Sequence, residues 1–266
     1  MNIRANSRKF VHSESMLASQ RKDYLLEVLR KTGQIVAKSV SQELGLSEDT
    51  IRRDLRELAS EGRLQRVHGG ALPASAAVGD LATRERLAPE GKIAIARAAA
   101  KLIKPGQVVI LDGGTTTLQL ANQLPRQLRA TVVTHSPAIA VALQEHTGIE
   151  VVMIGGRLFR HSMVAVGAAA VESIGRIRAD LYFMGVTGIH PVAGLSTGDL
   201  EESHVKRALI NSAAETYVLV SSEKLNAASP YVISACSAIS GLIIEPGIAA
   251  QSVAPFEAAG LTVIRA

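Results

Sequence analysis

The sequence predicts an α/β protein of two domains, a small helical head and a larger body with a mainly parallel sheet. Apolar residues recur at helical spacing up to about residue 60, and short apolar runs alternate with helical segments beyond about residue 90. The stretch between these regions is aperiodic and rich in Ala, Pro, Gly and charge. Short strands that alternate with helices are typical of a parallel βαβ sheet. We therefore expect a head over 19–72, a linker over 73–89 and a body over 90–266.

The chain begins with a polar, aperiodic stretch over 1–18, which we expect to be a disordered arm. Met16 immediately precedes the first periodic segment, which makes it an alternative start of translation that the intact mass of the natively expressed protein would test. A first helix is expected from Arg21 to about residue 32, where Gly33 suits the left-handed residue that ends many helices. A second, shorter helix is expected over 38–44.

A third helix is expected from Glu48 to about residue 60, with Ser47 as the capping residue at its start. Its apolar stripe places three side chains toward the head's core and leaves its basic residues outside. After it, residues 63–68 alternate like a strand and end at a glycine pair. Helix, helix, turn, basic helix and hairpin together make a winged helix-turn-helix. The buried stripe consists of Ile51, Leu55 and Leu58.

The basic third helix is the part that a helix-turn-helix inserts into the major groove of DNA. Residues 1–79 hold 13 Lys and Arg against 9 Asp and Glu, whereas the rest of the chain holds 16 against 15. Solvated surface charge is the alternative for any one arginine, and Asp54 and Glu57 are expected to pair with arginines of their own helix. The candidate DNA contacts are Lys22, Ser47, Thr50, Arg52, Arg53, Arg56, Arg66 and His68.

The body shows seven short apolar runs that predict strands, with no internal repeat. After the first of them, the sequence DGGTTT at 112–117 leads into a helix expected to start near Thr116. Such a junction presents backbone N–H groups and hydroxyls to one spot, which suits an anion, although a tight turn without a ligand is the alternative. It matches neither the nucleotide P-loop nor the dinucleotide fingerprint. The predicted strands are 108–111, 131–134, 151–154, 181–184, 217–221, 242–244 and 261–264.

Further polar residues follow strand ends, where open α/β sheets place ligands. These are Gly155, Gly156, Arg157, Gly185, Gly188 and Lys224. Glu202 and Lys206 are four residues apart on an expected helix over 200–212, and an ordinary surface ion pair would explain them equally well.

Composition excludes several classes of protein and of site. The single Cys236 lies in an apolar stretch and is expected to be a buried, inert thiol. The histidines lack metal-ligand spacing, and the chain shows neither a serine-nucleophile elbow nor a triad, so we expect no metal, no cofactor and no catalytic residue. No apolar run approaches the roughly 20 residues of a membrane span. We expect a cytoplasmic protein.

The two halves together resemble the DeoR/GlpR family of bacterial transcriptional regulators from about Gln20 to the C-terminus. The motifs that carry the resemblance are SEDTIRRDL at 47–55, RVHGGA at 66–71, LDGGTTT at 111–117, VVT at 132–134, the glycines 155–156, GL at 194–195 with Thr197, and Glu202 with Lys206.

The resemblance implies an oligomeric regulator whose body is similar to sugar-phosphate isomerases and senses a phosphorylated sugar or polyol. On that basis Asp112, Gly113, Gly114, Thr115, Thr116, Thr117, His135, Ser136, Gly155, Gly156, Glu202, Lys206 and Lys224 are effector-site candidates. The chain departs from the family pattern where Val36 replaces a capping Ser or Thr, His135 an Asn, Ser221 an Asp and Glu245 an Asp. The last three changes suggest an unusual effector.

Two functions therefore stand against each other. The leading hypothesis is a homo-oligomeric regulator, expected to repress a sugar or carbon-catabolic operon, whose binding to double-stranded operator DNA depends on a phosphorylated sugar-like effector. The alternative is a sugar-phosphate isomerase with an accessory DNA-binding head, in which Lys206 and Glu202 would supply acid and base groups. A nicotinamide-binding protein is disfavoured by the absent glycine fingerprint.

Overall fold

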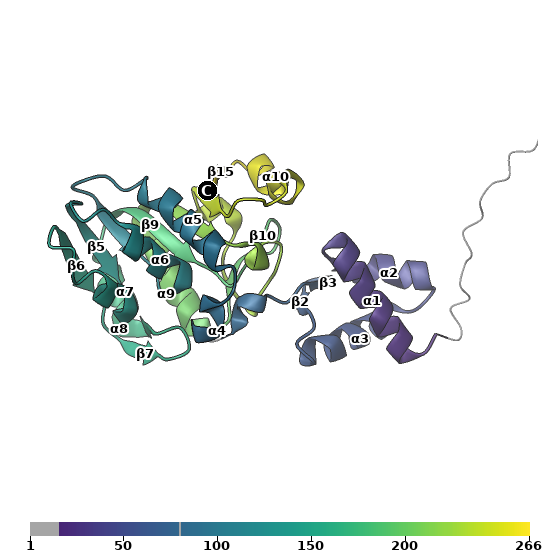
Figure 1. Ribbon diagram of the computed structural model, residues 1–266. Helices are drawn as coiled ribbons and strands as arrows, with labels where there is room; N and C mark the ends of the chain where they lie inside the picture. The colour runs from purple at the N-terminus through teal and green to yellow at the C-terminus, as the bar shows by residue number, and fades with distance from the viewer. Residues whose placement is uncertain (1–15, 80) are drawn as a thin grey trace, which may run out of the picture. The chain divides into compact units, whose positions relative to one another are not determined.

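The computed structural model describes residues 16–79 and 81–266, and the chain divides into two compact units between Pro73 and Ala74 (Figure 1). Each unit has a hydrophobic core of its own. The predicted disordered arm lies almost entirely outside the described residues. The first helix begins at Ala18.

The first unit is the predicted winged helix-turn-helix. Its three strands form an antiparallel sheet in the order β1-β3-β2. Gly70 makes this sheet possible, because a Cβ at that position would lie 1.7 Å from the carbonyl oxygen of Ile35. The elements are α1 (Ala18–Thr32), β1 (Ile35–Val36), α2 (Ala37–Leu44), α3 (Glu48–Ser60), β2 (Gln65–Val67) and β3 (Gly70–Leu72).

The ends of the helices follow the local sequence. Gly33 ends α1 in the left-handed conformation, with φ of 75°, and its N–H donates to the carbonyl of Leu29 at 2.9 Å. The Ser47 hydroxyl caps α3 by accepting from the Thr50 N–H at 3.2 Å, as predicted. Val36 occupies the capping position of α2 without a side-chain hydrogen bond, and such a missing cap costs about 1 kcal/mol.

The second unit is built on a parallel sheet of seven strands, and all seven predicted strands belong to it. The strands are β4 (Val108–Leu111), β5 (Ala130–Thr134), β6 (Ile149–Met153), β9 (Ala179–Gly185), β12 (Ala213–Val220), β14 (Gly241–Ile244) and β15 (Thr262–Arg265). Their order is β15-β14-β12-β9-β4-β5-β6, so the strand order reverses between β4 and β9. Such a reversal opens a crevice at the carboxyl ends of the strands, where this class of fold binds ligands.

Helices cover both faces of the sheet. One face packs against α5 (Pro89–Ala100), α6 (Thr115–Gln123) and α7 (Pro137–Ala142). The other packs against α8 (Ala168–Ile174), α9 (Leu200–Asn211) and α10 (Ala250–Ala258). Among the described residues, no helix is long and apolar enough to cross a membrane.

Short antiparallel pieces complete the second unit. They were not predicted, because runs of three or four residues show too little alternation to be recognised. The pieces are β7 (Arg157–Phe159), β8 (Val164–Val166), β10 (Gly188–His190), β11 (Gly194–Thr197) and β13 (Tyr231–Ser234).

All of the predicted linker except its first residue, Pro73, belongs to the second unit, which begins at Ala74. It contains a short 3-10 turn, η2 (Ala76–Val78), and the helix α4 (Leu81–Glu85). Both are too short to leave a periodic pattern in the sequence. Ala77 is buried, although α4 itself buries no residue.

Candidate functional sites

The outer face of α3 is basic. Arg52, Arg53 and Arg56 are exposed, and Ile51 and Leu58 lie in the head's core. Arg52 forms an ion pair with Glu48 one turn earlier, at 2.7 Å between Nη2 and Oε2. Within the described part of the chain, Arg53 and Arg56 have no ion pair, so their guanidinium groups are free to meet phosphates or base edges.

Asp54 and Glu57 do not pair with arginines of their own helix, so that prediction is wrong. Asp54 is buried and receives two hydrogen bonds from the guanidinium of Arg21 in α1, one of them 2.9 Å long. Glu57 pairs with Lys22, also in α1, at 2.7 Å. Position 54 lies on the inner side of the helix, and its carboxylate therefore faces the neighbouring helix. These two ion pairs join α1 to α3.

The other predicted DNA contacts differ in their exposure to solvent and in their partners. The Lys22 ammonium is held by Glu57 and lies 3.4 Å from Glu61. In the wing, Arg66 in β2 and His68 just after it are exposed. Thr50 is half-buried, and its hydroxyl lies 2.9 Å from that of Ser47.

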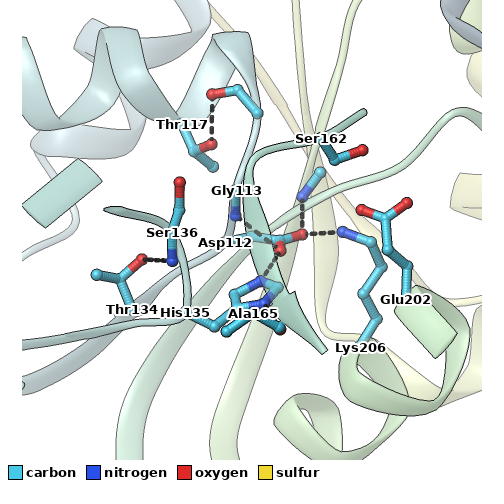
Figure 2. Close-up of polar contacts among 12 residues, drawn as sticks. Asp112, Gly113, Thr117, Thr134, His135, Ser136, Ser162, Ala165, Glu202 and Lys206 are labelled. Atoms are coloured by element: carbon cyan, nitrogen blue, oxygen red, sulfur yellow. Dashed lines mark hydrogen bonds and ion pairs between the residues drawn. The ribbon is translucent and has the colours of Figure 1, made fainter. Parts of the chain in front are cut away.

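In the body, Asp112 is the centre of a buried polar cluster at the carboxyl end of β4 (Figure 2). Its Oδ1 accepts from the Gly113 N–H and from His135 Nε2, both at 2.8 Å. Its Oδ2 accepts from the Gly185 N–H at 2.8 Å and from the ammonium of Lys206. Gly185 ends β9, so this carboxylate bridges the two strands between which the sheet order reverses.

The neighbours of Asp112 also fix the charge of its carboxylate. Burial by itself raises the pKa of Asp112, but Lys206 and His135 outweigh it and hold that pKa well below its usual range. All four acceptor positions of the carboxylate are occupied, which leaves none for a proton. His135 Nδ1 lies 2.9 Å from the carbonyl oxygen of Ala165, which can only accept. Both ring nitrogens of His135 therefore lie against acceptor oxygens, which fix the ring between Asp112 and Ala165.

Glu202 and Lys206 are not the surface ion pair that their spacing allowed. Both are buried on α9, at 6% and 4% exposure. Lys206 pairs with Asp112, and the Glu202 carboxylate accepts from the Thr197 hydroxyl at 3.2 Å. The reason is that this face of α9 turns toward the sheet crevice and not toward solvent.

A pocket opens directly above the Asp112 cluster. Five of the predicted effector residues, Gly113 to Thr117, line it with Glu202, Lys206 and Lys224. The Thr116 hydroxyl is buried and has no hydrogen-bond partner in the described part of the chain. Lys224 is 7% exposed, and burial lowers the pKa of its ammonium to about 8.

Several other residues line this pocket that the sequence analysis did not select. Some of their polar side chains come from short strands and loops that leave no periodic signal, and Arg84 and Lys92 come from α4 and the start of α5. The missed residues are Ala77, Arg84, Lys92, Val186, Thr187, Thr197 and Glu223, whereas Gly185 was noted in the sequence as a strand-end position.

Five predicted effector residues do not line this pocket, and one of them is Asp112, which lies beneath it. His135 and Ser136 are buried beneath it, where His135 supports Asp112 and the Ser136 hydroxyl donates to the Met163 carbonyl at 3.2 Å. Gly155 and Gly156 follow β6 at the edge of the sheet, and Gly155 lines a different, shallow depression.

The positions that depart from the family pattern have structural roles near the pocket. The Ser221 hydroxyl donates to Glu223 at 2.6 Å, and Glu245 accepts from the Ser222 N–H at 2.7 Å. A Cβ on Gly91 would lie 1.8 Å from the Glu245 carboxylate, so α5 approaches this side chain as closely as a glycine allows. Glu245 thereby braces the turn that carries Lys224.

Comparison with known proteins identifies both units. Residues 21–76 match the model of the DeoR-like helix-turn-helix domain, and residues 88–245 match that of the DeoR C terminal sensor domain. The chain is 35% identical to the HTH-type transcriptional regulator GlpR of Haloferax volcanii, over 94% of this chain and 98% of that protein. It is 30% identical to the HTH-type transcriptional repressor GlcR of Bacillus subtilis, over 86% and 89% of the two chains.

A third relative and two solved structures extend the comparison. The glycerol-3-phosphate regulon repressor of Escherichia coli is 30% identical over 79% of this chain and 83% of its own. Ribose 5-phosphate isomerase A of Methanocaldococcus jannaschii superposes with a TM-score of 0.38 at 19% identity, over 51% of this chain and 54% of that one. The sorbitol operon regulator SorC of Klebsiella pneumoniae gives a TM-score of 0.35 at 12% identity, over 80% and 92%. With both domain models matched and the relatives aligned over most of their length, the chain belongs to the DeoR family of DNA-binding transcriptional regulators and not to the sugar-phosphate isomerases.

Proposed function

We propose that the protein represses a sugar or carbon-catabolic operon and that a phosphorylated sugar or polyol, bound in the pocket above Asp112, controls its affinity for operator DNA. The observation that carries the proposal is the unsatisfied polar lining of that pocket. The first turn of α6 offers N–H groups that no helical carbonyl accepts, and the Thr116 hydroxyl beside them has no partner in the described residues. Lys224 adds a buried cation. Donors and positive charge at one point suit a phosphate group.

The rest of the pocket suits the other end of such a ligand. The Glu202 and Glu223 carboxylates and the Thr187 and Thr197 hydroxyls line it, and these groups accept or donate hydrogen bonds to hydroxyl groups. The Escherichia coli relative is named for the glycerol-3-phosphate regulon, and glycerol 3-phosphate is a phosphorylated polyol. The Asp112 carboxylate lies beneath the pocket and supports the residues that line it. Its acceptor positions are all filled, so it is not free to act as a base in turnover.

The effector site is tested by Thr116→Val, which removes the hydroxyl and keeps the shape of the side chain. We expect the affinity for phosphorylated compounds to fall roughly tenfold or more, because a hydrogen bond to a charged group contributes about 1.5–3 kcal/mol. The stability of the free protein should stay equal or rise, since a buried hydroxyl without a partner is removed. Calorimetric titration with hexose, pentose and triose phosphates measures the first effect, and thermal unfolding the second.

The matched control is Thr262→Val on the edge strand β15, where the side chain is exposed and far along the sheet from the crevice. It should change neither quantity. Equal affinity in Thr116→Val and wild type would exclude the anion site at α6, and the absence of any phosphorylated ligand for the wild-type protein would exclude the proposed effector class.

For the head, we propose that Arg53 and Arg56 contact the operator, with Thr50, Arg66 and His68 as further contacts. Arg53→Ala should weaken binding to the operator duplex by roughly 1–3 kcal/mol if the guanidinium reads a base edge. A phosphate contact would instead lower the slope of log affinity against log salt by about one. Fluorescence anisotropy with a duplex selected from random sequence distinguishes the two results.

A charge-matched control for this experiment is Arg97→Ala, an exposed arginine on α5 of the body. It removes the same charge from the chain and should leave both the affinity and the salt slope as in the wild type. An Arg53→Ala protein that behaves like Arg97→Ala would remove Arg53 from the interface. We further propose that the operator-bound form is a homo-oligomer, which light scattering of the free protein and of the DNA complex would test.

A further inference from the structure

The residues that follow the head most closely in sequence form part of the wall of the ligand pocket. Ala74, the first residue of the second unit, pairs with Ala228 in a parallel bridge. The Ser75 hydroxyl donates to the Thr187 carbonyl, and Ala77 is only 2% exposed. Within four residues of the head, the chain is therefore already part of the body's packed structure.

This segment lies where two compartments of the pocket meet. The second compartment is lined by the loop around Ser162 and by other residues, and four residues line both compartments. Two of those four, Ala77 and Arg84, come from the segment over 74–88, which connects the head to α5. A ligand that extends from the α6 end of the pocket toward Ser162 would therefore pass along it. The four shared residues are Ala77, Arg84, Thr187 and Glu202.

The segment and the first turn of α5, which follows it, also bring positive charge to the pocket. Lys92, in the first turn of α5, is 2% exposed and donates to the carbonyl oxygen of Arg84. It has no ion pair among the residues that the structure describes. Arg84 lines both compartments, and its guanidinium donates to Ser162 at 3.3 Å. The carboxylates that attract the Lys92 charge, Glu223, Glu245 and Glu85, form no direct ion pair with it. A buried cation without a direct partner is unfavourable, and an anionic ligand would supply one.

The later part of the segment, over 81–88, buries no residue against the body. Helix α4 buries no side chain. Ala88, between α4 and α5, has φ of 44°, a left-handed conformation that costs an L-residue of this kind about 1–2 kcal/mol. Thinly packed, strained segments have a small free energy of local opening. Contacts made by a ligand could therefore shift the balance between the packed and the open segment.

We infer that Arg84 and Lys92 bind the effector, so that occupancy of the pocket determines whether the segment 74–88, which leads directly from the head, is packed on the body. This inference rests on the proposed function. It adds the residues through which ligand binding changes the packing of the segment that follows the head in sequence. A ligand that contacts the segment only in its packed position stabilises that position, and by linkage anything that opens the segment weakens the ligand.

Two measurements on the full-length protein test this. Hydrogen exchange of the amides of 74–88 should slow when the best-binding compound from a panel of hexose, pentose and triose phosphates is added. Lys92→Met, which keeps most of the aliphatic stem, should weaken that compound roughly tenfold or more. Lys101→Met is the control, because that lysine is exposed at the other end of α5, and it should leave the affinity unchanged.

A third variant separates the segment's packing from its charge. Ser75→Ala removes the hydrogen bond to the Thr187 carbonyl but none of the cations, so it should weaken the ligand less than Lys92→Met does and still reduce the ratio of operator affinities measured without and with the ligand. A wild-type protein that binds the compound with unchanged exchange at 74–88, or a Lys92→Met protein equal to Lys101→Met, would overturn the inference alone. A wild-type protein that binds none of the panel would overturn the proposed function and the inference with it.

Discussion

Asp112→Asn is expected to lower the free energy of unfolding of the body by about 3–5 kcal/mol, the range measured when one partner of a buried ion pair is removed. The carboxylate accepts from four donors and is completely buried. An asparagine can accept at one side-chain oxygen only, and its amide group would face donors on the other side. The Lys206 ammonium would then lie in the crevice without its counter-charge.

Native-state hydrogen exchange of β4 and β9 measures this effect, because it reports on the body separately from the head. Asp199→Asn is the matched control. Asp199 caps α9 by accepting from the Glu202 N–H at 3.0 Å, and asparagine caps a helix about as well as aspartate. That variant should stay within about 0.5 kcal/mol of the wild type. A similarly small change in Asp112→Asn would contradict the charge state derived for the cluster.

The difference in stability between wild type and Asp112→Asn should depend on pH. The pKa of Asp112 is lowered in the folded protein, so its contribution to stability is present above the ordinary carboxyl pKa of about 3.9 and is lost as the pH falls through the lower folded value. The difference in stability between wild type and Asp112→Asn should therefore be constant near neutral pH. It should narrow as the pH falls below about 4, because the protonated carboxyl of the wild type then resembles the amide.

The sequence predicted the architecture well because the architecture depends on periodic patterns. The stripe of Ile51, Leu55 and Leu58 located α3, and runs of apolar residues located each strand of the parallel sheet. The junction at 112–117 was predicted as an anion site from local chemistry alone, and its residues from Gly113 onward line the pocket. Its role in binding remains a proposal.

What the sequence did not reveal depends on contacts between distant segments. No spacing rule connects Lys206 with Asp112, which are 94 positions apart, and the nearer Glu202 appeared to be the better partner. Lys92 lay just past a stretch without periodicity, so nothing in its neighbourhood indicated a pocket. In the head, the spacing along α3 predicted that Asp54 pairs with an arginine of its own helix, but α1 packs against α3 and places Arg21 beside it.

Arg21→Met is expected to destabilise the head by about 3 kcal/mol, at the lower end of the range for a broken buried pair because the Arg21 side chain keeps 13% exposure. The Asp54 carboxylate, 3% exposed, would remain in the core without its counter-ion. Hydrogen exchange of α1 and α3 should speed up, while that of the body stays unchanged. Operator affinity should fall as well, since α3 carries the candidate DNA contacts.

A second substitution decides whether charge pairing or the presence of an arginine stabilises the head. In the double variant Arg21→Met with Asp54→Leu, both charges are replaced by apolar groups, and such replacements are often neutral. Stability should return to within about 1 kcal/mol of the wild type. Arg30→Met, at an exposed position on the same helix, should change little. If the double variant were as unstable as Arg21→Met, packing of the arginine stem and not the unpaired carboxylate would be the cause. If it recovered stability and operator binding together, the ion pair between α1 and α3 would be a means of holding the recognition helix that apolar packing can replace.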